Sequence, residues 1–438
     1  MRRNVVQMGW LTGWLLWGLL AKAQTTPLAL QTAVDKASNN SMFAKMANTN
    51  EQLATAQYRQ TDAAYLPQVQ LAYSWMHTNN PLNVFGFKLQ QQAVTAADFN
   101  PALLNNPNGY SNTLTQLTIQ QPLVNLDAWQ QRKAAQSNIA VYQLQTQRTQ
   151  EFIRFEVTKA YLQLQLLYAT QLVLNEALQT ATAVQIFTQH RVQQGLLQAS
   201  DALNIEVHLS GIRTQQTQVL ANITNVSNYL NYLMGEPYGK IYTAAPITNT
   251  TLWDNNDTTA TVRTDVVAMQ KALEAHRNMM LATQKSYLPR LNAFGNFQLN
   301  DKQLFGFNSN AYLVGVQLSW DVFKGLSTQR KIATQKVEHS LLEKQLANTQ
   351  QQATLEQQKT KEDLKAAAQK IIAQQQAVAQ AKEALRITRN RYEQGLVNTI
   401  DVLMAQTQLS QQQLQLTQTL CEQQTLLATL SYQTSTKK

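Results

Sequence analysis

The sequence has little of several residue types, and each shortage excludes a class of protein. Its 438 residues include one cysteine, Cys421, which excludes a disulfide scaffold. The five histidines never fall at the spacing of zinc ligands, which argues against a structural zinc site. Only 14 glycines and 9 prolines interrupt the chain, so we expect long uninterrupted elements. Charged residues make up 14%, and uncharged polar residues, among them 62 glutamines, take their place.

The first residues have the pattern of a secretory signal peptide. Arg2 and Arg3 are followed by an apolar run at residues 10–20 and by Ala-Lys-Ala at residues 21–23. The apolar run is short for a spanning helix, and a retained anchor is the alternative. We therefore expect residues 1–23 to be removed on export.

The remaining charge does not indicate a nucleic-acid partner. The formal net charge is +10, and the basic residues are spread along the chain rather than gathered into a patch or stripe. After residue 23 there is no apolar run of 18 residues. If the exported chain enters a membrane, it must do so with β-strands.

Internal similarity is the strongest signal in the sequence. Residues 191–203 align with residues 391–403 without a gap, and Arg, Gln, Gly, Leu and Asp recur at the same places. Tyr-Leu-Pro at residues 65–67 likewise recurs at residues 287–289. We therefore divide the chain into a signal peptide (1–23), a first structural repeat (24–235), a mid-height linker (236–263), a second structural repeat (264–432) and a tail (433–438).

Each repeat contains two segments with the period of two that is typical of strands. Val69, Leu71, Tyr73 and Trp75 share one face of the first such segment, and polar or small residues share the other. Lengths near ten, an apolar face and aromatic ends fit a membrane barrel strand, whereas a soluble hairpin with one wet face is the alternative. Because the chain is exported, we favour the membrane. The four strands are expected at about 66–76, 112–122, 288–300 and 311–323.

Two very long helices follow the strand pairs. Residues 127–193 and 326–394 contain neither glycine nor proline, and each would form a helix of about 100 Å. Apolar residues step by three and four along both the long helix and the returning helix of the first repeat. This spacing predicts antiparallel coiled-coil hairpins at about 126–234 and 326–432. The hairpin tips are expected at residues 194–200 and 394–400.

The order of these elements, written twice, resembles the TolC-like outer membrane efflux proteins, also called outer membrane factors. Residues 28–34, 39–41 and 263–266 are similar to the segments that open the family's repeats. The resemblance covers nearly the whole mature chain. It implies a homotrimer in the outer membrane of a Gram-negative bacterium, with a twelve-stranded β-barrel in lipid and a helical tunnel extending into the periplasm. Independently, four strands cannot close a barrel, since about eight is the practical minimum. The expected fold class is therefore mainly α with a membrane β-barrel portion.

The resemblance also implies a function. Such a protein is a passive exit duct of a tripartite efflux or type I secretion system, and it works with a periplasmic adaptor and an inner membrane pump. The tips, which comprise Gln194, Gly195 and Leu196 with Gln394, Gly395 and Leu396, would dock the adaptor. The alternative is that the two glycines simply end a helix in the left-handed conformation.

Three residues near the tips match positions that close the entrance in the family: Asp201, Asp401 and Tyr392. The two acids are also well placed to cap the first turn of a helix, which is the alternative. Met404 stands where some members have a second acid, and Val397 where some have a basic residue. Both departures argue against a tightly latched gate and against strong cation selectivity.

Other interpretations lead to different proteins. A soluble periplasmic coiled-coil adaptor or scaffold would need a compact β-domain, which the sequence does not indicate. An exported enzyme would need a convergent set of acids, bases or nucleophiles, and we identify no catalytic, metal or cofactor site. The segment 77–111, with Phe85, Phe87 and Phe99, is expected to face outside the cell, where it either plugs or narrows the barrel mouth or is a surface loop.

Overall fold

The computed structural model describes residues 25–247 and 263–434. The expected signal peptide, half of the linker and part of the tail lie outside these residues. The described residues form two compact units, the first from residues 25–49, 144–247, 263–266 and 349–434, and the second from residues 50–143 and 267–348. Both sequence repeats contribute to each unit. The expectation of a mainly helical chain with a few strands is confirmed.

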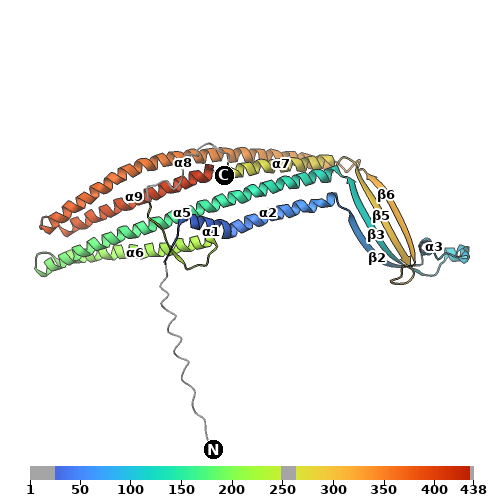
Figure 1. Cartoon of the computed structure of the whole chain (residues 1–438), viewed down its shortest axis with the longest axis horizontal. Helices are drawn as coiled ribbons and strands as arrows, with labels where there is room; N and C mark the ends of the chain where they lie inside the picture. Colours follow the sequence, from blue (N-terminus) through green and yellow to red (C-terminus); the bar gives the residue numbers. More distant parts are fainter. Residues whose placement is uncertain (1–24, 248–262, 435–438) are drawn as a thin grey trace, which may run out of the picture. The chain divides into compact units, whose positions relative to one another are not determined.

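The second unit contains a four-stranded antiparallel sheet. Its strands are β2 (Gln68–Thr78), β3 (Tyr110–Val124), β5 (Arg290–Asp301) and β6 (Ser309–Ser319), in the order β2-β3-β5-β6 (Figure 1). In this sheet β2 and β6 each pair on one side only. The strand expected at 311–323 ends earlier, at Ser319. Just beyond it, the indole N–H of Trp320 donates to the carbonyl of Tyr287 at 2.9 Å.

The register gives this sheet two chemically different faces. Residues directly opposite one another share a face, because side chains alternate along each strand. The "apolar face" carries Val69, Leu71, Tyr73, Trp75, Leu117, Ile119, Phe297, Leu299, Tyr312, Val314, Val316 and Leu318, with the polar residues Thr113, Thr115, Asp301 and Asn310 toward one end of it. The "polar face" carries Gln68, Gln70, Tyr110, Asn112, Gln116, Thr118, Gln120, Asn292, Asn296, Gln298, Asn300, Ser309 and Gln317, with the apolar residues Met76, Leu114, Phe294 and Leu313 among them.

Between β2 and β3 the chain folds into short helices rather than an irregular loop. These are α3 (Pro81–Gln90), the 3₁₀ turn η2 (Ala96–Phe99) and α4 (Pro101–Asn105). Asn80 and Asn100 cap α3 and α4, and a proline follows each of them. Asparagine followed by proline is a helix-start signal, and it occurs here twice within one segment.

Besides the sheet, the second unit contains parts of several helices. They belong to α2 (Met42–Gln60), η1 (Thr61–Ala64), α5 (Leu126–Gln193), α7 (Thr264–Lys285) and α8 (Ser327–Glu393). Arg132 on α5 pairs with Asp62 and lies 4.2 Å from the ring centre of Tyr58. Asp127 pairs with Arg290 at the start of β5. These pairs join the first turns of α5 to the neighbouring elements.

The first unit contains two antiparallel helical hairpins, α5 with α6 (Ala199–Met234) and α8 with α9 (Thr399–Thr434) (Figure 1). α1 (Leu30–Asn40) packs against α6. The predicted apolar positions of α5 and α6 form much of the buried core: Ile153, Val157, Ala160, Leu164, Leu167, Leu174, Ala181, Ile205, Leu209, Ile212, Val219, Ile223, Leu230 and Leu233. Burial of these side chains is the main favourable term for the unit.

A short parallel pair of strands, β1 (Thr25–Pro27) and β4 (Ile241–Thr243), lies beside this core. Tyrosines hold it in place: the Tyr161 hydroxyl donates to the carbonyl of Leu28 at 3.0 Å, and that of Tyr168 to the carbonyl of Tyr242 at 2.9 Å. The sequence analysis did not predict this pair, because three-residue strands carry too few positions for a pattern.

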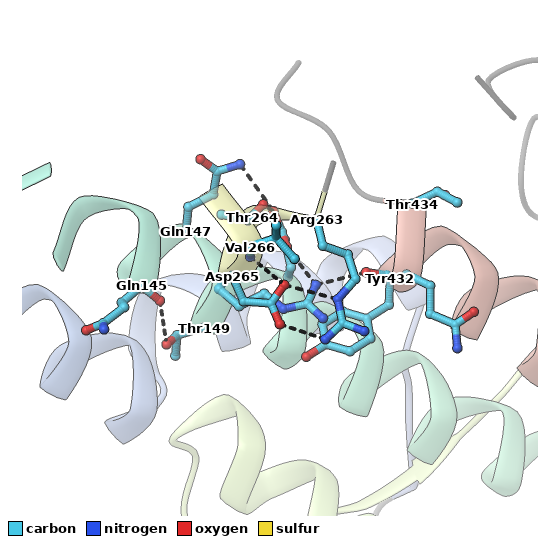
Figure 2. A network of polar contacts seen from close by, with 12 residues as sticks. Gln145, Gln147, Thr149, Arg263, Thr264, Asp265, Val266, Tyr432 and Thr434 are labelled. Atoms are coloured by element: carbon cyan, nitrogen blue, oxygen red, sulfur yellow. Dashed lines mark hydrogen bonds and ion pairs between the residues drawn. The ribbon is translucent and has the colours of Figure 1, made fainter. Parts of the chain in front are cut away.

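A polar network joins two helix ends of the first unit to the interiors of α5 and α8 (Figure 2). Arg263 donates to both carboxylate oxygens of Asp265, at 3.0 and 2.6 Å, and to Glu356 at 2.8 Å. Arg148 donates to the carbonyl of Tyr432 at 2.9 Å and lies 3.6 Å from the centre of its ring. The start of α7 and the end of α9 are thereby fixed to α5 and α8.

None of the helices in the described ranges combines the length and the apolar character needed to cross a membrane.

Candidate functional site at the tips of the helical hairpins

Both hairpin tips have the same backbone geometry. Gly195 and Gly395 have φ values of 74° and 77°, in the left-handed region that favours glycine. The following residues, Leu196 and Leu396, donate from their backbone N–H to the carbonyls of Arg191 and Arg391, at 2.8 and 2.9 Å. The glycines donate to the carbonyls three residues back, which completes a Schellman motif at each tip. The recurring Gln-Gly-Leu therefore encodes how α5 and α8 end.

The returning helices begin in the same way on both sides. Asp201 accepts from the backbone N–H of Gln198 at 3.3 Å, and Asp401 from that of Asn398 at 2.9 Å. The two carboxylates thus cap the starts of α6 and α9, where the helix dipole also favours negative charge. Asp401 is exposed and Asp201 is half-buried.

Tyr392 connects the two hairpins near the tips. Its side chain is 3% exposed, and its hydroxyl lies 2.7 Å from the Thr188 hydroxyl on α5 and 3.0 Å from the Thr399 hydroxyl on α9. Its ring lies 5.1 Å from that of Phe187, centre to centre, at an angle of 59°. One tyrosine therefore contacts an element of each hairpin besides its own helix.

A second connection runs between the tips themselves. Arg191 donates to the carbonyl of Glu393 at 3.4 Å, and its guanidinium lies 4.7 Å from the ring centre of Phe187. A Cβ atom at Gly395 would lie 3.4 Å from the same guanidinium. The structure thus brings the two repeated Gly-Leu turns, 200 residues apart in sequence, close to each other.

Gln194, Leu196, Gln394 and Leu396 are all exposed. The structure therefore leaves the four nonglycine tip residues open to solvent, while Tyr392 is buried. Sequence analysis did not single out Thr188, Phe187 and Thr399 as partners of Tyr392. Contacts across such separations leave no local pattern, and only the recurrence of Arg191 at position 391 indicated a role for that arginine.

The described residues hold no group of three or more His, Cys, Asp or Glu side chains that could hold a metal ion.

Comparison with known proteins identifies the arrangement. The outer membrane efflux protein family matches residues 33–236 and 258–433. No curated protein matches the sequence.

Several solved structures share the fold. VceC from Vibrio cholerae is 20% identical with a TM-score of 0.76, over 92% of this chain and 95% of that one. The CmeC outer membrane channel of Campylobacter jejuni is 15% identical with a TM-score of 0.80, over 92% and 85%. The open state of the MtrE outer membrane channel of Neisseria gonorrhoeae is 14% identical with a TM-score of 0.76, over 92% and 88%.

At these identities the structures establish the fold alone, whereas the family match extends over most of the chain. The resemblance seen in the sequence is thereby confirmed, and the protein belongs to the outer membrane efflux protein family.

Proposed function

We propose that the protein is an exit duct in the outer membrane of a Gram-negative bacterium, a passive conduit from the periplasm to the exterior. The observation that carries this proposal is the four-stranded sheet with an apolar face, a polar face and two strands paired on one side only. Side chains such as Leu71, Val314 and Leu318 on its apolar face are 66–70% exposed in the single chain. Lipid on one face and water on the other satisfy this pattern.

In a membrane, the free edges of β2 and β6 must pair with strands from further copies of the same chain. Unpaired backbone N–H and C=O groups cannot remain in hydrocarbon, so the sheet must close. Two chains would supply eight strands, which leaves no water-filled lumen, whereas three supply twelve. The proposal is therefore a homotrimer with cyclic symmetry and the polar face turned inward.

The hairpin tips form the periplasmic entrance in this proposal. Gln194, Gly195 and Leu196, with Gln394, Gly395 and Leu396, would dock a periplasmic adaptor that connects the duct to an inner membrane pump. The exposure of the four nonglycine tip residues supports this role. Both tips have the same Schellman geometry, so they would present similar surfaces to the adaptor.

Asp201, Asp401 and Tyr392 are proposed to shape the entrance. Three copies of the exposed Asp401 around an axis would form a ring of negative charge that favours cations. The Tyr392 hydroxyl, held between Thr188 and Thr399, would keep the two hairpins of one chain together in the closed entrance.

Cell fractionation tests the proposal, followed by gels of boiled and unboiled detergent extracts. We expect an outer membrane band near three times the monomer mass of 49.4 kDa, or slightly less after signal removal, before boiling. Crosslinking from cysteines placed at Gln194 and Gln394 should then capture the adaptor. A soluble periplasmic monomer would refute the duct and favour a coiled-coil scaffold.

A further inference from the structure

The segment of residues 79–109, which contains α3, η2 and α4, is fixed to the end of the sheet by buried hydrogen bonds. Gln91, which is 5% exposed, donates to the carbonyl of Ser111 at 2.9 Å and to the side chain of Asn112 at 2.8 Å. Its own side-chain oxygen accepts from the Tyr110 hydroxyl at 2.9 Å. The side-chain amide of Gln91 is thus satisfied at both its nitrogen and its oxygen by the first residues of β3.

The same end of the sheet contributes a second set of contacts. Asn112, fully buried, donates to Asn300 on β5 at 3.0 Å. The Ser309 hydroxyl on β6 lies 2.5 Å from the carbonyl of Gln90 and 3.1 Å from that of Asn300. The end of α3 is therefore attached to β3 and β6, and Asn300 on β5, which lies between them, belongs to the same network. Figure 1 shows α3 beside this end of the sheet.

The side chains of β3, β5 and β6 that take part in these attachments lie on one side of the sheet, and the bond to Ser111 is to its backbone carbonyl. In the register, Tyr110, Asn112, Asn300 and Ser309 share the polar face, and none of them belongs to the apolar face. The segment therefore contacts side chains of the polar face, which would line the lumen.

An ion pair stabilises the segment internally. Lys88 on α3 pairs with Asp98 on η2, and the Lys88 ammonium lies 5.4 Å from the ring centre of Tyr110. The Lys88 hydrogen bond, with two more from Thr95, lowers the pKa of Asp98 to about 2. The pair therefore persists through mildly acidic conditions.

We propose that residues 79–109 form a fixed cap, which narrows the outer exit of the duct and limits its conductance. The inference rests on the proposed function, because the polar face lines a lumen only if the sheet closes with its apolar face outward. Buried glutamine and asparagine side chains that bond three strands resist displacement, since each broken contact would leave a buried polar group unpaired. The cap is therefore a permanent constriction rather than a free surface loop.

Single-channel recording with the full-length protein in planar lipid bilayers tests the cap. In a Tyr392→Phe background, which loosens the closed entrance, replacing residues 81–106 by a short Gly-Ser linker should raise the conductance about twofold or more, because the outer exit is then the narrowest region and limits ion flow. A deletion variant that forms trimers with unchanged conductance would overturn the cap and leave the duct intact. A wild-type protein that neither assembles nor conducts would refute the proposed function, and the cap with it.

A labelling experiment covers the case in which the deletion variant fails to fold. Leu103 on α4 is 51% exposed, and the variant Leu103→Cys offers a thiol in the cap to a charged methanethiosulfonate reagent. We expect a lasting fall in current on labelling. The matched control is Val314→Cys on the apolar face, and the wild type checks that buried Cys421 does not respond. Complete labelling of Leu103→Cys with no change in current would place the segment outside the conduction path.

Discussion

The hydroxyl of Tyr392 contacts hydroxyls on α5 and α9, and all three groups are nearly inaccessible to solvent. Tyr392→Phe removes this hydroxyl and keeps the ring against Phe187. Thr188 retains its bond to the carbonyl of Val184 at 2.9 Å, whereas Thr399 loses its partner. We expect a local destabilisation of about 1–3 kcal/mol, because a buried polar group is left unpaired. Hydrogen exchange at the tips measures it.

The control for this substitution is Tyr238→Phe, at a tyrosine that is 70% exposed. It should leave exchange at the tips unchanged. Equal exchange in Tyr392→Phe and in the wild type would contradict a connecting role for the hydroxyl.

Asp265 gives the first unit a pH-dependent contribution to stability. Burial alone would raise the pKa of Asp265, but hydrogen bonds and charge from Arg263 outweigh it and hold the pKa below 3.8. A carboxyl whose pKa is lower in the folded state stabilises the fold above its unfolded pKa. This contribution is lost as the pH falls through the folded value. Asp265→Asn should therefore unfold at a lower temperature than the wild type at pH 7, and the two should converge in acid.

Circular dichroism of detergent-solubilised protein follows this convergence. Asp363→Asn is the control, because Asp363 is an exposed acid on α8 of the same unit. It should match the wild type at every pH. A difference between Asp265→Asn and the wild type that stays constant down to the most acidic sample would exclude the ion pair as its source.

At the scale of elements, three helices end in the same motif with different surroundings. Gly235 ends α6 with a φ of 66°. The backbone N–H of Glu236 donates to the carbonyl of Asn231 at 2.8 Å, as the residue after the glycine does at the two tips. A Cβ at Gly235 would lie 2.6 Å from the carbonyl oxygen of Asn40, whereas at Gly195 it would meet no described atom within 4 Å. Gly195→Ala should thus cost about 1–2 kcal/mol for the left-handed backbone alone. Gly235→Ala should cost more, because α1 must move.

Thermal unfolding of the two variants, measured side by side, tests this difference. Since the backbone conformation is the same, the excess loss in Gly235→Ala reports the contact between α6 and α1. Equal losses of stability in the two variants would mean that Asn40 moves aside at no cost in free energy.

The sequence predicted the elements whose signals are long and local. The absence of glycine and proline over long stretches predicted α5 and α8. The strands begin and end within a few residues of the expected positions, except at the end of β6. Helices α3 and α4 were missed because ten and five residues are too few for a periodic pattern. Their Asn-Pro starts were the available signal.

The candidate site was predictable to the same extent. The repeated Gly-Leu turns drew attention to residues 194–200 and 394–400, whose motif is set by neighbours in sequence. The partners of Tyr392 were not predictable, since Thr188 lies 204 residues away and its position depends on how the hairpins pack. Alternation with a period of two likewise predicts which residues of one strand share a face. The pairing register between strands is needed to show that Asn112, Asn300 and Ser309 lie on the same face of the sheet.

At the scale of the whole molecule, the two faces of the sheet make opposite predictions for adjacent residues. Val316 lies on the apolar face and is 63% exposed, and Gln317 lies on the polar face and is also exposed. If the apolar face meets lipid, Val316→Arg costs about 2–4 kcal/mol near the membrane midplane. Gln317→Arg, which points into water, should cost little.

Outer membrane fractions and unboiled gels of the two variants give the readout. We expect the trimer band to fall sharply for Val316→Arg and to persist for Gln317→Arg. A soluble scaffold would expose both faces to water, so it would tolerate both arginines and remain in the periplasmic fraction. Because the two residues are adjacent in one strand and both become arginine, the place in the strand and the introduced charge are matched, and the loss of β-propensity at Val316 is at most about 1 kcal/mol. A difference between the variants therefore reports which side of the sheet meets lipid.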